Sequence, residues 1–152
     1  MPRSVWQRLP VGGTFDVSGR FRYEAAPADL SARPLYWRGI AAIEPESVAV
    51  FERLAPAGGG IVVDVGAHTG LYTLLACSVG ANVVALEPVE RVHHQRQRNV
   101  ALNGWTNRCR LLLAAADAHT GTVEVVEPRS SLPSSAHLAG AAYRSDEGKR
   151  VT

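Results

Sequence analysis

The sequence of 152 residues lacks several features that mark particular classes of protein. Its formal net charge is only +2, which gives no reason to expect a nucleic acid or an acidic membrane surface as a partner. No apolar run approaches the roughly 20 residues that a membrane-spanning helix needs, and the N-terminus lacks the charged-then-apolar build of a signal peptide. With 46% hydrophobic and 20% charged residues, the composition predicts a soluble globular domain.

Cysteine is also scarce, because the chain contains only Cys77 and Cys109. Both stand in apolar stretches without the spacing of metal ligands, so no metal site is predicted. His93 and His94 are adjacent, and their rings are expected to point apart on a helix rather than share a metal ion. We interpret the two cysteines as buried, reduced thiols, which is typical of a cytoplasmic protein.

The most informative stretch is residues 61–70, which read Ile-Val-Val-Asp-Val-Gly-Ala-His-Thr-Gly. A short apolar run that ends at glycine predicts a strand buried on both faces, and the pattern after it predicts a helix. Gly66 and Gly70 allow a sharp turn and a close approach of the backbone to a ligand. Asp64 is costly in a buried strand unless something pairs with it, so we expect it to face a crevice. Strand, glycine turn and helix indicate the first unit of a nucleotide-type binding fold.

The rest of the chain alternates predicted strands and helices around this unit. Before it, we expect a hairpin at 14–24 around Ser18-Gly19 and a helix at 45–54. After it, we expect a helix at 71–79, a strand at 82–86, a helix at 89–102, a strand at 110–116 and a half-exposed strand at 122–126. This alternation predicts a parallel sheet with flanking helices and a ligand crevice beyond the carboxyl ends of the strands.

Residue spacing also predicts which helix faces are buried. In the helix at 45–54, one face carries Ser47, Val50, Phe51 and Leu54. In the helix at 89–102, Val92 and Val100 mark the apolar side, but basic residues crowd the middle, Arg96 among them. We interpret these basic residues as a solvated face.

An acidic residue is expected at the carboxyl end of each of the three parallel strands, namely Asp64, Glu87 and Asp117. Glu87 follows the glycine turn by about 20 residues, where a carboxylate accepts hydrogen bonds from a ribose diol. Asp117 has an equally good structural explanation, because an aspartate beside Thr120-Gly121 is a common turn residue. We expect the three carboxylates to converge on the crevice.

The glycine spacing discriminates between nucleotide-like ligands. A dinucleotide fingerprint is G-x-G-x-x-G, whereas here His68 stands where the second glycine would be. The carboxylate of Asp64, two residues before Gly66, would repel a pyrophosphate and suits a cationic ligand. The pattern therefore disfavours an NAD-type oxidoreductase module and favours S-adenosylmethionine, which has an ammonium, a sulfonium and a ribose.

Four segments resemble, in order and spacing, the motifs of FkbM-type methyltransferases. They are residues 62–75, 85–88, 99–104 and 114–117 with Gly121. The resemblance implies a Rossmann-like class I methyltransferase fold and methyl transfer from S-adenosylmethionine, usually to a hydroxyl of a sugar or secondary metabolite. By position it implies that the cofactor contacts Asp64, Gly66, Ala67, His68, Gly70, Glu87 and Asp117. Asp64, Gly66 and Gly70 would line the methionine end, Glu87 would bind the ribose, and Asp117 would lie on the adenine side.

The sequence departs from the family pattern in two places. Arg96 stands where the family usually has leucine, and nothing after Val126 matches the family's fourth strand with its lysine, aspartate and glutamate-glycine. Because the segment that would carry a catalytic base has no match, we assign no base. His68 is a candidate only because we expect it to lie at the crevice. An inactive cofactor-binding remnant is therefore an alternative to an active enzyme.

We divide the chain into an N-terminal segment (1–45), a partial cofactor-binding domain (46–127) and a loop or disordered tail (128–152). The predicted sheet has only three parallel strands and a short following strand, so we interpret it as truncated relative to the family's sheet. The first strand then becomes an edge, whose unpaired backbone invites self-association. We expect a truncated gene product of marginal stability unless the N-terminal residues or a second copy cover that edge.

Overall fold

The computed structural model describes residues 11–26, 29, 31–40, 43–55, 60–122, 125–128, 137–138 and 148–151. At its centre lies a sheet of three parallel strands in the order β3-β4-β5. These strands are β3 (Ile61–Val65), β4 (Asn82–Leu86) and β5 (Cys109–Leu112). Helix α4 (Leu71–Ser78) connects β3 to β4, and α5 (Glu90–Leu102) with the short 3-10 helix η2 (Thr106–Arg108) connects β4 to β5. The predicted parallel sheet is confirmed.

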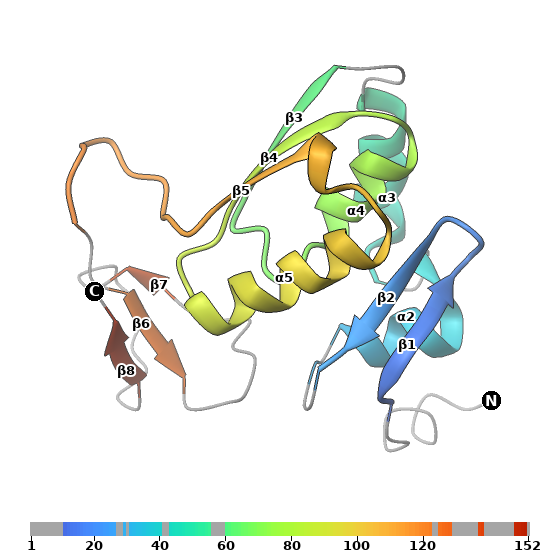
Figure 1. Cartoon of the computed structure of the whole chain (residues 1–152), viewed down its shortest axis with the longest axis horizontal. Coiled ribbons are helices and arrows are strands. Elements are labelled where there is room, and N and C mark those ends of the chain that lie inside the picture. The colour runs from blue at the N-terminus through green and yellow to red at the C-terminus, as the bar shows by residue number, and fades with distance from the viewer. Residues whose placement is uncertain are drawn as a thin grey trace.

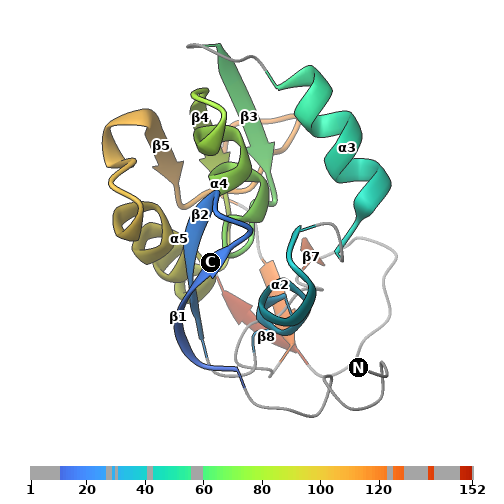
Figure 2. The same ribbon diagram turned by 90° about the vertical axis from the view of Figure 1, so that its right-hand side faces the viewer.

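The described elements are stacked in layers (Figures 1 and 2). Helices α4 and α5 lie against the sheet, and the antiparallel hairpin of β1 (Gly13–Val17) and β2 (Phe21–Ala25) packs on the far side of both helices. Helix α2 (Ala32–Arg38) contacts the hairpin, and α3 (Pro45–Leu54) approaches α4 where Phe51 meets Tyr72. The hairpin predicted around Ser18-Gly19 is confirmed. None of the described helices combines the length and the apolar character that a membrane crossing requires.

Two apolar clusters hold these layers together. One joins the hairpin to the helices, with Tyr23 of β2 packed among Leu74, Leu75 and Val100. The other joins α4 to β4 through small side chains, among them Ala76 and Ala85. Small residues at this second contact let the helix lie close to the sheet, which fixes the position of the turn that precedes α4.

Strand β3 is the edge of the sheet in the described part of the chain, as predicted. Its burial alternates, however, with Ile61, Val63 and Val65 each at least 60% exposed and Val62 and Asp64 half-buried. The prediction of a strand buried on both faces is therefore wrong. The described helices cover only the face that carries Val62 and Asp64, so an apolar run alone did not reveal which face is covered.

Helix α3 has the predicted bounds but a different buried face. Val48 is its buried residue, whereas Val50 is 54% exposed and Leu54 is 76% exposed. The predicted face of Ser47, Val50, Phe51 and Leu54 is wrong except at Phe51, which is half-buried against Tyr72. Helical spacing identifies an apolar face, but only the neighbouring elements decide whether that face is covered.

A second sheet lies beyond the carboxyl ends of the parallel strands (Figure 1). Strand β6 (Val125–Pro128) pairs antiparallel with β7 (His137–Leu138) and with β8 (Gly148–Val151). The prediction of loop or disorder for 128–152 is wrong at these strand residues, and the rest of that tail lies outside the described residues. Strand pairing depends on backbone hydrogen bonds to β6, which a composition without periodicity does not reveal.

The parallel strand predicted at 110–116 ends earlier, at Leu112.

Candidate functional site

The turn between β3 and α4 is tied to the end of the neighbouring strand. The backbone N–H groups of Gly66 and Ala67 both donate to the carbonyl oxygen of Leu86, at 3.0 and 2.9 Å. The backbone is left-handed at Gly66 (φ +72°), His68 (φ +50°) and Gly70 (φ +97°). The predicted glycine turn thus lies at the carboxyl end of the sheet, where parallel α/β folds bind ligands.

The two glycines of the turn have different surroundings. A side chain at Gly66 would meet no atom within 4 Å, so the backbone there is open to a ligand. A Cβ at Gly70 would lie 3.0 Å from Cγ of Arg96, so this glycine makes room for a buried side chain. Gly66 therefore fits a ligand-facing position, and Gly70 has a packing role.

Glu87 joins the carboxyl ends of all three parallel strands. Its carboxylate is buried and accepts hydrogen bonds from the N–H groups of His68 (2.9 Å) and Val89 (3.0 Å). Its own N–H donates to the carbonyl oxygen of Leu112 at 3.1 Å, at the end of β5. Each carboxylate oxygen keeps lone-pair capacity for a further donor, such as a hydroxyl of a ribose.

Asp64 faces helix α4 rather than solvent. Its Oδ2 accepts a hydrogen bond from the hydroxyl of Thr73 at 2.6 Å. Burial raises the pKa of Asp64, while the Thr73 hydroxyl and the charge of Arg96 act in the opposite direction. The pairing partner that a buried aspartate requires is therefore a threonine of the helix, with a cation nearby.

Arg96 is fully buried, so the prediction that it belongs to a solvated face is wrong. Its Nη2 donates to Nδ1 of His93 at 2.6 Å and to the carbonyl oxygen of Leu112 at 3.2 Å. Burial lowers the pKa of Arg96, and the charges of Glu87 and Asp64 raise it. The cause of the burial is that α5 is covered by β5 on one side and by β2 on another. A cation thus lies close to the two acids that the sequence singled out.

Polar atoms without partners mark this region. Within the described residues, Nε and Nη1 of Arg96 and Nε2 of His68 are buried and have no hydrogen-bond partner. Nδ1 of His68 lies 3.2 Å from the hydroxyl of Thr69. Such unsatisfied donors and acceptors in a native site call for a ligand or ordered water.

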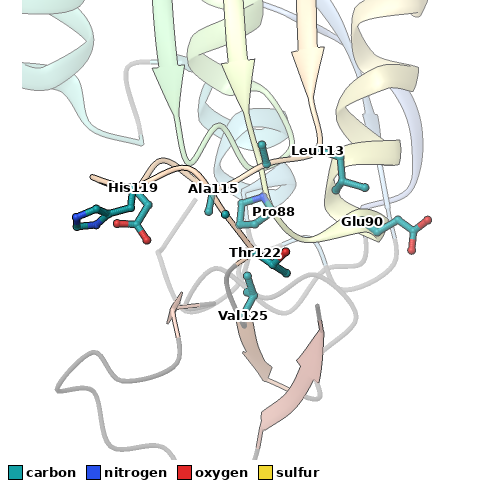
Figure 3. A pocket seen from close by; sticks show the side chains of 10 residues that line it. Pro88, Glu90, Leu113, Ala115, His119, Thr122 and Val125 are labelled. Atoms are coloured by element: carbon teal, nitrogen blue, oxygen red, sulfur yellow. The ribbon is translucent and has the colours of Figure 1, made fainter.

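A cavity of about 320 Å³ lies between the carboxyl ends of the parallel strands and the second sheet (Figure 3). It is lined by Pro88, Glu90, Leu113, Ala114, Ala115, Asp117, His119, Gly121, Thr122 and Val125. Of the three predicted carboxylates, Asp117 lines it, Glu87 directly precedes Pro88, and Asp64 is turned to α4. The carboxylates therefore do not converge on this cavity as predicted.

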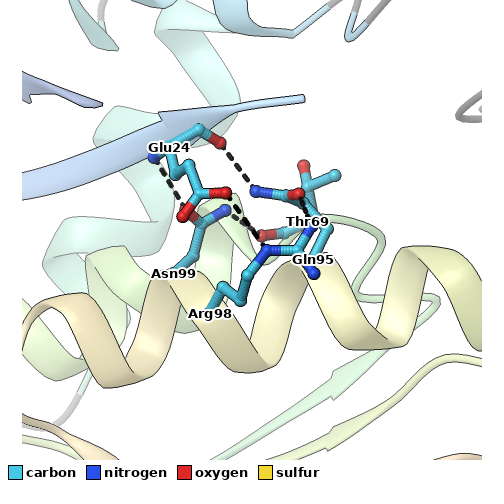
Figure 4. A network of polar contacts seen from close by, with 5 residues as sticks. All are labelled: Glu24, Thr69, Gln95, Arg98 and Asn99. Atoms are coloured by element: carbon cyan, nitrogen blue, oxygen red, sulfur yellow. Dashed lines mark hydrogen bonds and ion pairs between the residues drawn. The ribbon is translucent and has the colours of Figure 1, made fainter. Parts of the chain in front are cut away.

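The hairpin also contacts the glycine turn, which the sequence did not reveal. The hydroxyl of Tyr23 donates to Oδ2 of Asp29 at 2.7 Å and lies 2.6 Å from the hydroxyl of Thr69. Burial and then the charge of Asp29 raise the pKa of Tyr23 well above its usual range. Nδ2 of Asn99 donates to the carbonyl oxygen of Thr69 at 2.9 Å (Figure 4). The only signal in the sequence for the contacts of the turn with Tyr23 and Asn99 was Thr69, a polar residue inside the glycine turn.

Neighbouring contacts fix the hairpin on α5 (Figure 4). The N–H of Glu24 donates to Asn99, and Nε2 of Gln95 donates to the carbonyl oxygen of Glu24, both at 2.8 Å. Arg98 forms an ion pair with the carboxylate of Glu24 at 3.1 Å. Hairpin, α5 and turn are thus linked by consecutive hydrogen bonds.

Comparison with known proteins bears on the fold. No protein-family profile and no curated protein sequence matches this chain. Among solved structures, the chain is similar to the SAM-dependent methyltransferase from Agrobacterium tumefaciens, with a TM-score of 0.52 and 14% sequence identity. The match covers 70% of this chain and 34% of that chain, so this chain spans about a third of that protein's length. The chain has a Rossmann-like α/β fold with a parallel sheet, similar to that of this methyltransferase. At this identity the similarity establishes the fold alone.

The ligand-binding end of this fold combines three features of a binding site. The backbone at Gly66 is open, Glu87 has spare acceptor capacity, and the cavity beside Pro88 and Asp117 has a volume of about 320 Å³. Together they form a candidate site for a nucleoside-type ligand.

Proposed function

We propose that this chain is the S-adenosylmethionine-binding part of a methyltransferase. The observation that carries the proposal is the link between the open glycine turn and Glu87, whose buried carboxylate accepts the N–H of His68. This link joins a backbone surface for the methionine end to a carboxylate for the ribose. The Rossmann-like methyltransferase fold and the order of the four sequence motifs support it.

The proposal gives each predicted residue a part. The open backbone at Gly66 contacts the methionine end, with Asp64 and Glu87 supplying negative charge for its cationic groups. Glu87 accepts hydrogen bonds from the ribose hydroxyls. The adenine occupies the cavity that Pro88 and Asp117 line.

When bound, S-adenosylmethionine supplies a methyl group on a positively charged sulfur. The chain's own contribution is to hold the cofactor in one orientation, because alignment of two reactants supplies much of the rate in such transfers. The acceptor we propose is a hydroxyl of a small molecule, a sugar or a secondary metabolite, on the basis of the resemblance to FkbM-type methyltransferases.

Calorimetric titration with S-adenosylmethionine tests the proposal. We expect Glu87→Gln to weaken cofactor binding by about tenfold or more, because a charge-assisted hydrogen bond contributes about 1.5–3 kcal/mol. Asp64→Asn should weaken binding as well, because it removes a negative charge near the cationic groups. Glu46→Gln is the matched control, since this exposed acid on α3 should leave the affinity unchanged. Thermal melts of each variant separate loss of binding from loss of folding. Unchanged affinity in both site variants would contradict the proposal.

A cofactor-binding domain without turnover is the second candidate. It is favoured by the position of His68, the one base that the sequence suggested, which does not line the cavity and has a buried Nε2. Binding of S-adenosylmethionine with no methyl transfer to any hydroxyl acceptor would support it. Tighter binding of a nicotinamide dinucleotide would instead support an oxidoreductase module.

A further inference from the structure

Two thiols that the proposed cofactor site does not use lie against each other. Cys77 is in the last turn of α4 and Cys109 begins β5, yet their Sγ atoms are 3.1 Å apart. Both are free cysteines. A disulfide has an S–S distance of about 2.05 Å, so a movement of about 1 Å would bring the two sulfur atoms to bonding distance.

The two thiols differ in access to solvent. Cys77 is 3% exposed and belongs to the apolar cluster between α4 and β4. Cys109 is half-buried and lines a groove of about 270 Å³ at the amino ends of the parallel strands. Arg108 and Arg110 line the same groove. Cys109 is therefore the more accessible of the two thiols to a small oxidant.

The two thiols also differ in acidity. The hydrogen bond from the Cys77 thiol lowers the pKa of Cys109, partial burial opposes this, and the charges of Arg96 and Arg108 lower it further. The same hydrogen bond and burial raise the pKa of Cys77. Cys109 therefore ionises first, and a thiolate is the reactive form of cysteine.

We propose that Cys109 is a peroxide-reactive thiol and that Cys77 resolves its oxidised form, so that a reversible disulfide joins α4 to β5. An accessible thiol, cations beside it and a second thiol in contact are the combination found in redox-sensing cysteines. Ordinary packing of two cysteines in a core accounts for the contact, but it does not account for the position of Cys109 at a groove that two arginines also line. The inference is independent of the proposed function.

The oxidation proceeds in two balanced steps with a hydroperoxide as the oxidant. The Cys109 thiolate attacks one peroxide oxygen, the O–O bond breaks, and the leaving oxygen takes a proton, which leaves a sulfenic acid on Cys109. The sulfur of Cys77 then attacks the sulfenic sulfur and forms the S–S bond. The hydroxide that leaves takes the proton of the Cys77 thiol and departs as water. The two thiols lose two electrons together, and the peroxide gains them.

Intact mass spectrometry of the reduced chain after treatment with hydrogen peroxide tests the proposal. We expect wild type to lose the mass of two hydrogen atoms without forming a dimer, and dithiothreitol to reverse the change. Peptide mapping should join the segments that contain Cys77 and Cys109. A mass that does not change, or a disulfide that forms only between two copies, would overturn the proposal.

Two alanine variants assign the roles. Cys77→Ala should stop at the sulfenic acid, which dimedone traps, whereas the matched Cys109→Ala should give no dimedone adduct and react with peroxide about tenfold more slowly than wild type. Equal peroxide reactivity in Cys109→Ala and wild type would overturn the assignment of Cys109. If either variant does not fold, the mass change and peptide map of wild type decide the question alone.

Discussion

Gly66 and Gly70 show how the same residue type serves two purposes within one turn. Both have a left-handed backbone that costs an L-residue energy. Gly66 faces open space, whereas Gly70 faces the stem of the buried Arg96. Sequence spacing identified both as turn residues, but only their surroundings separate a ligand-facing glycine from a packing glycine.

Substitution by alanine should separate these two purposes. We expect Gly66→Ala to lower the free energy of unfolding by about 1–2 kcal/mol, from the left-handed backbone alone. Gly70→Ala should cost about 1 kcal/mol more, because its Cβ would crowd the Arg96 stem at 3.0 Å. Urea denaturation measures both changes.

Cofactor titration of the same pair adds a second comparison. The methyl group at position 66 would project into the open side of the turn, so Gly66→Ala should weaken binding of S-adenosylmethionine although it is the more stable variant. Equal stability of Gly70→Ala and Gly66→Ala would contradict the packing role that we assign to Gly70 beside Arg96.

Arg96 is the residue whose observed environment differs most from the one predicted from the sequence. A basic residue among other basic residues on a helix indicates a solvated face, and Arg98, two positions on, is indeed exposed. Arg96 is buried because its side of α5 faces the end of β5, where Leu112 accepts its hydrogen bond. Arg96 stands four residues after Val92 and four before Val100, so helical spacing places it on the same side of α5 as those two buried residues. Its charge was the misleading signal.

Among the elements, the hairpin has the least expected role. Ser18-Gly19 was sufficient to predict its strands, because a turn with glycine between two alternating segments is a local signal. Its contact with the glycine turn joins Tyr23 to Thr69, which are 46 positions apart in the sequence. The hairpin therefore helps to hold the turn that the proposed cofactor contacts.

Removing the Tyr23 hydroxyl should loosen this contact. We expect Tyr23→Phe to lower the free energy of unfolding by about 1–3 kcal/mol, because Oδ2 of the buried Asp29 loses its donor. Amide hydrogen exchange of residues 66–70 should become faster, because Thr69 loses a neighbour in the hairpin.

A matched variant at the other end of the same interface provides the control. Asn103 also bonds the hairpin, through the exposed N–H and carbonyl groups of Arg22. Asn103→Ala should cost less than about 1 kcal/mol and leave exchange in the turn unchanged. Faster exchange in Asn103→Ala than in Tyr23→Phe would argue against a specific role for the tyrosine.

At the scale of the whole molecule, the main feature is one face and edge of the parallel sheet that no element of the described part of the chain covers. Ile61, Val63 and Val65 project from the edge strand β3 and are largely exposed. An apolar edge strand with unpaired backbone groups is a site for pairing with another chain. Stability and association of this chain are therefore expected to depend on what contacts that edge.

A charge on the edge strand should reduce self-association. We expect Val63→Lys to shift the sedimentation of concentrated samples towards the monomer, because a lysine on an edge opposes strand pairing. Leu54→Lys is the control, since it replaces a 76% exposed apolar side chain at the end of helix α3 rather than in a strand. Equal effects of the two substitutions would indicate nonspecific apolar association instead.

The sequence by itself determined the local elements and their order. Glycine at 66 and 70, the apolar runs at 61–65 and 82–86 and the acidic residue at 87 were enough to predict strand, turn and helix, because these signals act between near neighbours. The tertiary structure alone decided which faces of β3 and α3 are covered, which groups hold the charge of the buried Arg96, and that Asp64 pairs with Thr73. Those outcomes depend on how layers pack against one another, and burial is a property of the neighbours that a residue acquires on folding.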